Sequence, residues 1–172
     1  FNSNGVRYWS SYYGGSNQDG NTGTGFDIHA DGDLFITFNT LSNNILVSSN
    51  AMKATNGITD AFIMRLNNDG WPKYATYFGG SAEDIPLDIK VDYNKNIVVV
   101  GATKSSSDIA SQPSYQSNIG GLEDGFILRI DSMGLLLWST YFGGASNDRL
   151  NAVTIADSFL VVGGQTRSSI DI

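Results

Sequence analysis

The chain has 172 residues, of which 41% are hydrophobic, and its 17 acidic side chains outnumber 10 basic ones to give a net charge of −7. This balance provides no Lys or Arg cluster for a phosphate backbone, so we expect no nucleic-acid partner. The chain has no cysteine, which excludes disulfides and thiolate metal sites, and no apolar run nears the roughly 18 residues of a membrane-spanning helix, so no membrane insertion is expected.

The first element is the aromatic segment Tyr8–Gly15, which we interpret as a lone fourth strand of a repeated unit. The first complete unit contains four predicted strands, over 25–31, 34–40, 60–67 and 73–80. Between its second and third strands lies the polar stretch 41–59, with a counterpart at 104–123. These long connections differ between units that are otherwise similar, so we expect a partner to bind there.

Three signatures recur at intervals of 63 to 65 residues, and each marks the same place in a unit. The first is an aromatic stretch that ends in two glycines: WSSYYGGS from Trp9, YATYFGGS from Tyr74 and WSTYFGGA from Trp138. The second is DAFIMRLNNDG from Asp60 and DGFILRIDSMG from Asp124. The third is an apolar strand that ends at Thr40, Thr103 or Thr166.

The repeat predicts an all-β fold made of tandem four-stranded antiparallel blades of a β-propeller, incomplete, with about two and a half blades in this chain. A four-stranded sheet cannot bury both faces alone and must pack against neighbours, whereas a β-sandwich, the alternative, gives no reason for a repeated signature. Within 1–172, the expected units are the last strand of a preceding blade (1–23), two blades (24–80 and 81–144) and a partial blade (145–172).

These ordered motifs, together with the acidic residue that follows each GGS or GGA segment, resemble the SBBP β-propeller repeat family over nearly all of 7–166. The resemblance implies blades of a propeller found mainly in modular bacterial surface and secreted proteins, and the family has no general catalytic assignment. Two departures stand out. The first hairpin turn, with Gly32 and Asp33 directly after Asp31, is expected to be short, and the copy number is too low for the roughly four to eight blades of a closed ring. We therefore expect other blades before Phe1 or after Ile172, or another protein chain, to cover the open ends.

The candidate site residues are the repeated glycines and aspartates, for which we predict a structural role: Gly14, Gly15, Asp19, Gly79, Gly80, Asp84, Gly143, Gly144 and Asp148. A catalytic acid is needed once, whereas a residue present in every unit serves the backbone, here as an Asx-type turn that satisfies glycine N–H groups. The glycine pairs open no helix, so a phosphate loop is not predicted.

The remaining polar residues suggest no catalytic or metal site. Asp27, Asp31 and Asp33, or Asn67 and Asp69, offer oxygen ligands for calcium, but their spacing is not that of an EF-hand and turn chemistry explains them better. His29 is the single histidine and has no nucleophile motif to serve. We expect no metal and no cofactor.

The function predicted from the sequence is a non-catalytic propeller module of an exported bacterial protein, extracellular or at the cell surface. It would act as a rigid scaffold or binding platform, with a glycan or protein as the possible ligand. The alternative is part of a propeller hydrolase or lyase whose active residues lie in blades outside this chain.

Overall fold

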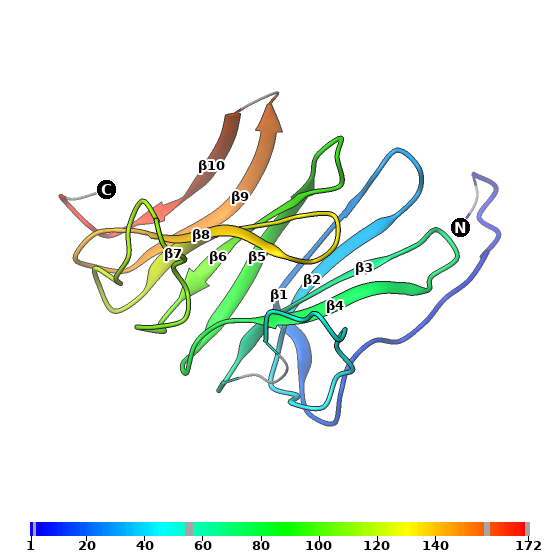
Figure 1. Cartoon of the computed structure of the whole chain (residues 1–172), viewed down its shortest axis with the longest axis horizontal. Helices are drawn as coiled ribbons and strands as arrows, with labels where there is room; N and C mark the ends of the chain where they lie inside the picture. The colour runs from blue at the N-terminus through cyan, green and yellow to red at the C-terminus, as the bar shows by residue number, and fades with distance from the viewer. Residues whose placement is uncertain (2, 54–56, 157–158, 171–172) are drawn as a thin grey trace.

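The computed structural model describes residues 1, 3–53, 57–156 and 159–170, and it shows an all-β protein (Figure 1). No helix occurs in these ranges, so none that could cross a membrane is found there. The strands are β1 (Asp19–Ile28), β2 (Leu34–Thr40), β3 (Asp60–Leu66), β4 (Pro72–Phe78), β5 (Asp84–Val91), β6 (Ile97–Thr103), β7 (Asp124–Ile130), β8 (Leu136–Phe142), β9 (Asp148–Ala156) and β10 (Phe159–Thr166).

The strands form three antiparallel sheets, two of four strands and one of two, which do not close into a ring. In the first sheet each strand pairs with the next one along the chain, in the order β1-β2-β3-β4, and β5 to β8 repeat this order. The register also repeats, because Phe62 lies opposite Tyr77 in the first sheet and Phe126 lies opposite Tyr141 in the second. The expected all-β fold of incomplete, blade-like four-stranded sheets is thus present.

The N-terminal segment departs from the prediction, because no strand forms over Tyr8–Gly15. In the two four-stranded sheets the equivalent segments are β4 and β8, which pair with β3 and β7. A strand needs a neighbour for its backbone hydrogen bonds. In the described part of the chain, no strand takes the place beside residues 8–15 that β3 takes beside β4. The first sheet begins instead with β1 at Asp19, before the expected boundary at residue 24.

The first hairpin turn is not shortened, contrary to the expectation from its sequence. The N–H of His29 donates to the carbonyl of Asp33, and in the next hairpin the N–H of Asp92 donates in the same way to Asn96, so both turns have the same length. His29 occupies the first turn position, where the second hairpin has aspartate. Gly32 adopts a φ of 92°, and Lys95 adopts 63° at the corresponding position.

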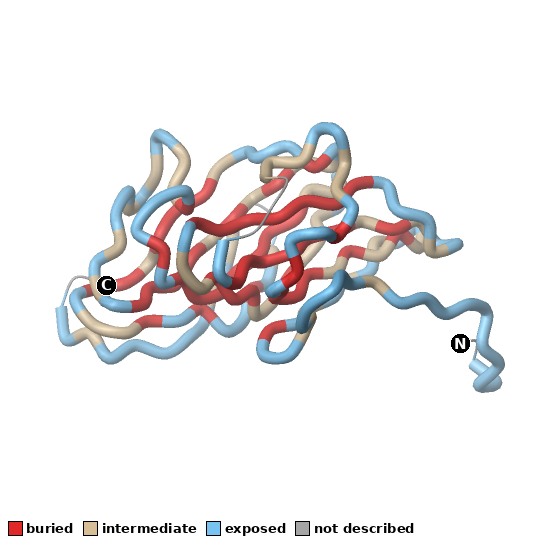
Figure 2. The backbone as a smooth tube through the Cα atoms, turned by 90° about the horizontal axis from the view of Figure 1, so that it is seen from below, coloured by how far each residue is buried: buried red, intermediate tan, exposed pale blue. Residues whose placement is uncertain are grey.

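The sheets pack side by side through their first strands, so that β5 lies against β1 on one side and β9 on the other. One cluster of buried residues joins the first two sheets and includes Phe35, Ile63 and Val99. A second joins Val98 to Leu150 across the next interface. The second sheet is therefore covered on both faces, which explains the continuous apolar sequence of β6, and buried residues run through the middle of the molecule (Figure 2).

The long connections cover the outer edges of the four-stranded sheets. In the first, the N–H of Ser48 donates to the carbonyl of Ala75 at 2.9 Å, and Lys53 accepts from the N–H of Tyr77 at 3.2 Å. In the second, Gln116 accepts in the same way from Tyr141. Each connection thus satisfies part of the edge that its own last strand would otherwise expose.

Candidate functional site

The repeated glycines and aspartates come together as a carboxylate clasp, our name for an aspartate that accepts hydrogen bonds from the glycine turn before it. Oδ2 of the aspartate accepts from the N–H of the second glycine at 2.7 Å in all three units. The pairs are Gly15 with Asp19, Gly80 with Asp84, and Gly144 with Asp148. Because these amides already donate to a carboxylate, they are not available to cradle an anion.

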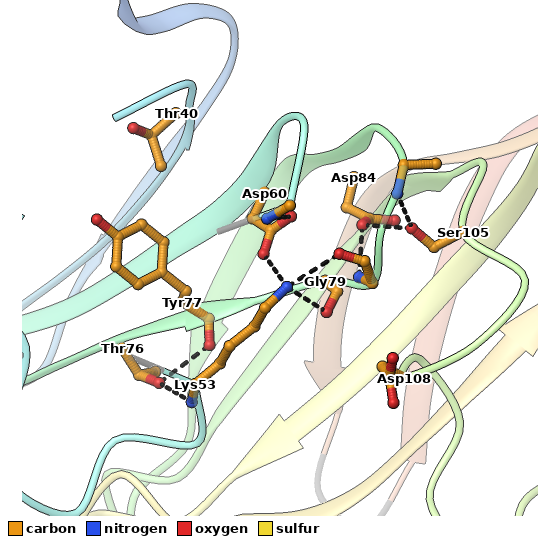
Figure 3. Close-up of polar contacts among 12 residues, drawn as sticks. Thr40, Lys53, Asp60, Thr76, Tyr77, Gly79, Asp84, Ser105 and Asp108 are labelled. Carbon is orange, nitrogen blue, oxygen red and sulfur yellow. Dashed lines mark hydrogen bonds and ion pairs between the residues drawn. The ribbon is translucent and has the colours of Figure 1, made fainter. Parts of the chain in front are cut away.

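Two further members of each clasp come from the end of the second strand. In the second unit, the Thr103 hydroxyl donates to Oδ1 of Asp84. Oγ of Ser105 donates to Oδ2 of the same carboxylate at 2.8 Å (Figure 3). The first and third clasps repeat this arrangement with the pairs Thr40 and Ser42, and Thr166 and Ser168.

Sequence reasoning identified the threonines only as strand ends and missed the serines. The signal was nevertheless present, because Thr-x-Ser occurs after every second strand at the repeat interval, as TLS, TKS and TRS. A serine two residues after a strand end is common in ordinary turns. Its role is recognised only when the aspartate that accepts from its hydroxyl is known.

The first glycine of each pair after β4 and β8 lies between two buried carboxyl groups. A Cβ on Gly79 would lie 2.6 Å from Oδ2 of Asp84 and 2.7 Å from Cγ of Asp60, and the φ of Gly79 is +152°. A Cβ on Gly143 would lie 2.8 Å from Cγ of Asp124. We call these two places, where a glycine separates an aspartate of one sheet from that of the next, the first junction and the second junction.

At the first junction Asp60 forms an ion pair with Lys53, whose Nζ lies 2.5 Å from Oδ2 (Figure 3). The same ammonium donates to the carbonyls of Gly79 and Gly80 at 2.9 and 3.0 Å. Asp60 is fully buried, so Lys53 compensates a charge that water does not reach.

At the second junction a neutral side chain replaces the lysine. Nε2 of Gln116 donates to Oδ2 of Asp124 at 2.8 Å, and Oε1 accepts from the N–H of Gly143 at 3.0 Å. The N–H groups of Gly120 and Gly121 complete the hydrogen bonding of this carboxylate at 2.8 and 3.1 Å. Backbone donors thus take over the compensation that an ammonium provides at the first junction.

Three aspartates of the two junctions have pKa values shifted from the ordinary one, and not all in the same direction. Burial raises the pKa of Asp60 above its ordinary value despite the bond from Lys53. Burial also raises the pKa of Asp84, against the opposing effect of its hydroxyl and amide donors. At Asp148 burial acts in the same direction, but the bonds from Thr166, Gly144 and Ser168 outweigh it and lower the pKa.

The candidate calcium ligands are occupied by groups of the chain itself. Asp33 accepts from Arg65 and Lys95, and the pKa of Asp31 is lowered by hydrogen bonds from Lys95 and His29. Asp27 instead accepts from the N–H of Val91 in the next sheet at 2.9 Å. Within the described ranges, no group of three metal-ligating side chains occurs.

Each junction opens on a groove at the outer side of the sheets. The groove at the first junction has a volume of about 370 Å³ and is lined by Lys53, Gly79 and residues 108–111. The groove at the second, about 450 Å³, is lined by Gln116 and by Tyr115, whose ring stacks on Phe142 at 5.9 Å. Each junction thus combines a closed polar network with an adjacent groove.

No protein-family model matches the chain, and no curated protein sequence is significantly similar to it.

Proposed function

We propose that this chain is a non-catalytic β-propeller module, of the type its repeats resemble, that serves as a rigid scaffold and binding platform. The observation that carries the proposal is the recurrence of the carboxylate clasp, with the same donors on the same oxygens in every unit. A network repeated at each unit and closed on itself holds sheets in position, whereas a reaction requires one exceptional site.

The contacts between sheets support a propeller arrangement. Oδ2 of Asp27 accepts from the N–H of Val91, and Oδ2 of Asp88 accepts from the N–H of Val153, both at 2.9 Å. Asp27 and Asp88 lie at different positions of their strands, but in both cases an aspartate of one first strand accepts from a backbone N–H of the next. The side-by-side packing of first strands therefore recurs, as in a radial array of blades.

The partners that we propose for the open ends are other blades or another protein chain. Phe26 is 74% exposed, although its counterpart Ile89 is fully buried against the sheet before it. At the other end, Val161 of β10 is 55% exposed. We expect the chain alone to self-associate or to unfold readily, which size-exclusion chromatography with light scattering measures. A stable, monodisperse monomer would contradict the proposal.

Export to the cell surface or the extracellular space, in a bacterium, is the location that the repeat resemblance favours. A chain without cysteine tolerates an oxidising environment because it has no thiol to oxidise or mispair. Protease treatment of intact cells is expected to release its peptides, and protection of these peptides until the cells are lysed would count against export.

The ligand that we propose for the platform is a glycan or a protein segment bound in the groove at the second junction. The exposed ring of Tyr115 beside polar Gln116 offers stacking together with hydrogen bonding. On a glycan array, Tyr115→Ala is expected to remove binding, while Tyr93→Ala, at a more exposed tyrosine in the turn between β5 and β6, preserves it. Equal binding by both variants would exclude this groove.

A further inference from the structure

The N-terminal aromatic segment contrasts with its two counterparts in exposure. Tyr77 of β4 and Tyr141 of β8 are 0% and 1% exposed, and each donates its hydroxyl to a backbone carbonyl. Tyr12, 65 positions before Tyr77, is fully exposed. The sequence of the segment is that of a strand with a buried tyrosine, but no element in the described part of the chain packs over Tyr12.

One side of the segment is already held against the first sheet. Nε1 of Trp9 donates to the carbonyl of Asn68 at 3.0 Å, and the Tyr13 hydroxyl donates to that of Gly70 at 2.7 Å. The segment therefore lies beside the turn between β3 and β4, as Figure 1 shows. Holding it in place in advance lowers the entropy cost of adding a strand to it.

The backbone of residues 7–13 makes no pairing within the described part of the chain. Across the described ranges, no residue forms a hydrogen bond with the main chain of residues 7–13. An extended backbone with unused N–H and C=O groups is the usual site of β-augmentation, in which an incoming strand supplies the missing ladder.

The turn before the segment has the form of a hairpin turn. Gly5 adopts a φ of 78°, close to the 83° of Gly70 and the 89° of Gly134, the glycines that end the turns before β4 and β8. Gly5 lies 65 positions before Gly70, the same offset that relates Tyr12 to Tyr77, so the alignment needs no gap. A strand that enters through this turn would run antiparallel to residues 8–15.

We infer that residues 8–15 form a strand-acceptor site for one occupant, a β-strand of the type of β3 and β7 that enters through the turn at residues 3–5. This inference rests on the repeat architecture of the proposed function. The register of β3 with β4 places a phenylalanine of the occupant opposite Tyr12 and an arginine opposite Trp9, as Phe62 faces Tyr77 and Arg65 faces Tyr74.

The occupant would also form a junction at Gly14 and contribute to the groove beside it. The three atoms nearest to a Cβ on Gly14 all belong to Asp19, whereas those nearest to a Cβ on Gly79 come from two aspartates, so the first aspartate of the occupant would supply the second carboxyl group. The adjacent groove of about 370 Å³ is lined by Tyr12, Tyr13, Ile45 and Leu46, and Leu46 is 90% exposed. The apolar residues of the occupant would cover this surface.

The test is a fusion that joins a copy of residues 58–65 directly before Phe1, because Phe1 aligns with Leu66. Hydrogen exchange followed by mass spectrometry should show the amides of residues 8–14 exchanging at least about tenfold more slowly than in the unfused chain. The matched control fusion, with Phe62→Asp in the added copy only, should give no slowing. Equal exchange in the fused and unfused chains would overturn the inference.

Tyr12→Ala in the fused protein should restore rapid exchange at residues 8–14, by about tenfold, because it removes the aromatic pair with the added phenylalanine. Tyr93→Ala, equally exposed but on the turn between β5 and β6, should leave the slowing unchanged. Hydrogen exchange at residues 8–14 reports on the strand-acceptor site alone. If the unfused chain proves to be a stable monomer, the propeller proposal is contradicted, but slowed exchange in the fusion would still support this inference.

Discussion

The first and second junctions share a backbone arrangement but differ in how a buried carboxylate is compensated. At the first junction Lys53 supplies an ammonium to Asp60, and at the second Gln116 and two glycine amides serve Asp124. Since both arrangements hold neighbouring sheets in the same way, geometry rather than charge is the property that the repeat preserves. The charge instead determines how each junction responds to substitution and to pH.

The largest expected effect separates the glycines of the two junctions. Gly79→Ala should lower the free energy of unfolding by about 3 to 4 kcal/mol, because it combines a left-handed φ with contact between its Cβ and two buried carboxyl groups. Gly143→Ala should cost about 2 kcal/mol, since crowding acts there without the strain at φ. Urea denaturation measures both.

Gly14→Ala is the control for these glycines, because the carboxyl group that its Cβ would meet belongs to the partly exposed Asp19, which has room to move. Its cost should stay below about 1 kcal/mol. Equal losses at the three glycines would show that the second carboxylate of a junction has no effect on packing.

The second prediction concerns the compensating side chains. Lys53→Ala should cost about 2 to 3 kcal/mol, less than for a wholly buried pair because the lysine side chain is 30% exposed. Gln116→Ala should cost about 1 to 2 kcal/mol, since it removes neutral partners only. Thermal unfolding of the two variants under one buffer condition gives the comparison.

Lys53→Gln sharpens this comparison because it converts the first junction to the chemistry of the second. It should recover at least half of the stability that Lys53→Ala loses, because the amide can still donate to Asp60. If the glutamine variant were as unstable as the alanine variant, the charge of Lys53 would be essential and the two junctions would not be equivalent.

The third prediction tests the hydroxyl members of the clasp. Ser105→Ala should cost about 1 to 2 kcal/mol, because it leaves Asp84 and the N–H of Ala82 each with one partner fewer in a buried site. Ser42→Ala should cost less, since its longer bond of 3.2 Å goes to the partly exposed Asp19. A larger loss at Ser42 in urea denaturation would contradict the role of burial.

The smallest expected effect is a difference in pH dependence. The pKa of Asp84 is raised above 3.8, so its contribution to stability is complete below that pH and is lost as the pH rises through the raised value. The pKa of Asp148 is lowered, so its contribution is present above pH 3.8 and is lost as the pH falls.

Asp84→Asn should therefore reduce the loss of stability on going from about pH 3 to pH 7, while Asp148→Asn should reduce the loss on acidification. Denaturation in urea across this range measures both slopes, and each variant serves as the control for the other. Identical pH profiles of the two variants would contradict opposite pKa shifts of Asp84 and Asp148.

Local sequence patterns were sufficient to predict the place of most strands and the spacing of the repeat, although β1 (Asp19–Ile28) begins before the predicted 25–31. The apolar stretches ending at Thr40 and Thr103 are β2 and β6, because β-branched and aromatic runs bounded by turn residues have few other stable conformations. The recurrence of GGS and GGA every 64 or 65 residues likewise predicted repeated sheets, since a repeated unit folds in a repeated way.

Features that depend on a distant partner could not be predicted in this way. Tyr8–Gly15 has the sequence of a strand yet pairs with nothing in the described ranges, because a ladder requires a neighbouring backbone as well as a suitable sequence. The compensation of Asp60 by Lys53 and the place of Ser105 in the clasp became clear only when the chain was folded. Composition and periodicity act over a few residues, whereas these contacts join segments that only the packing of sheets brings together.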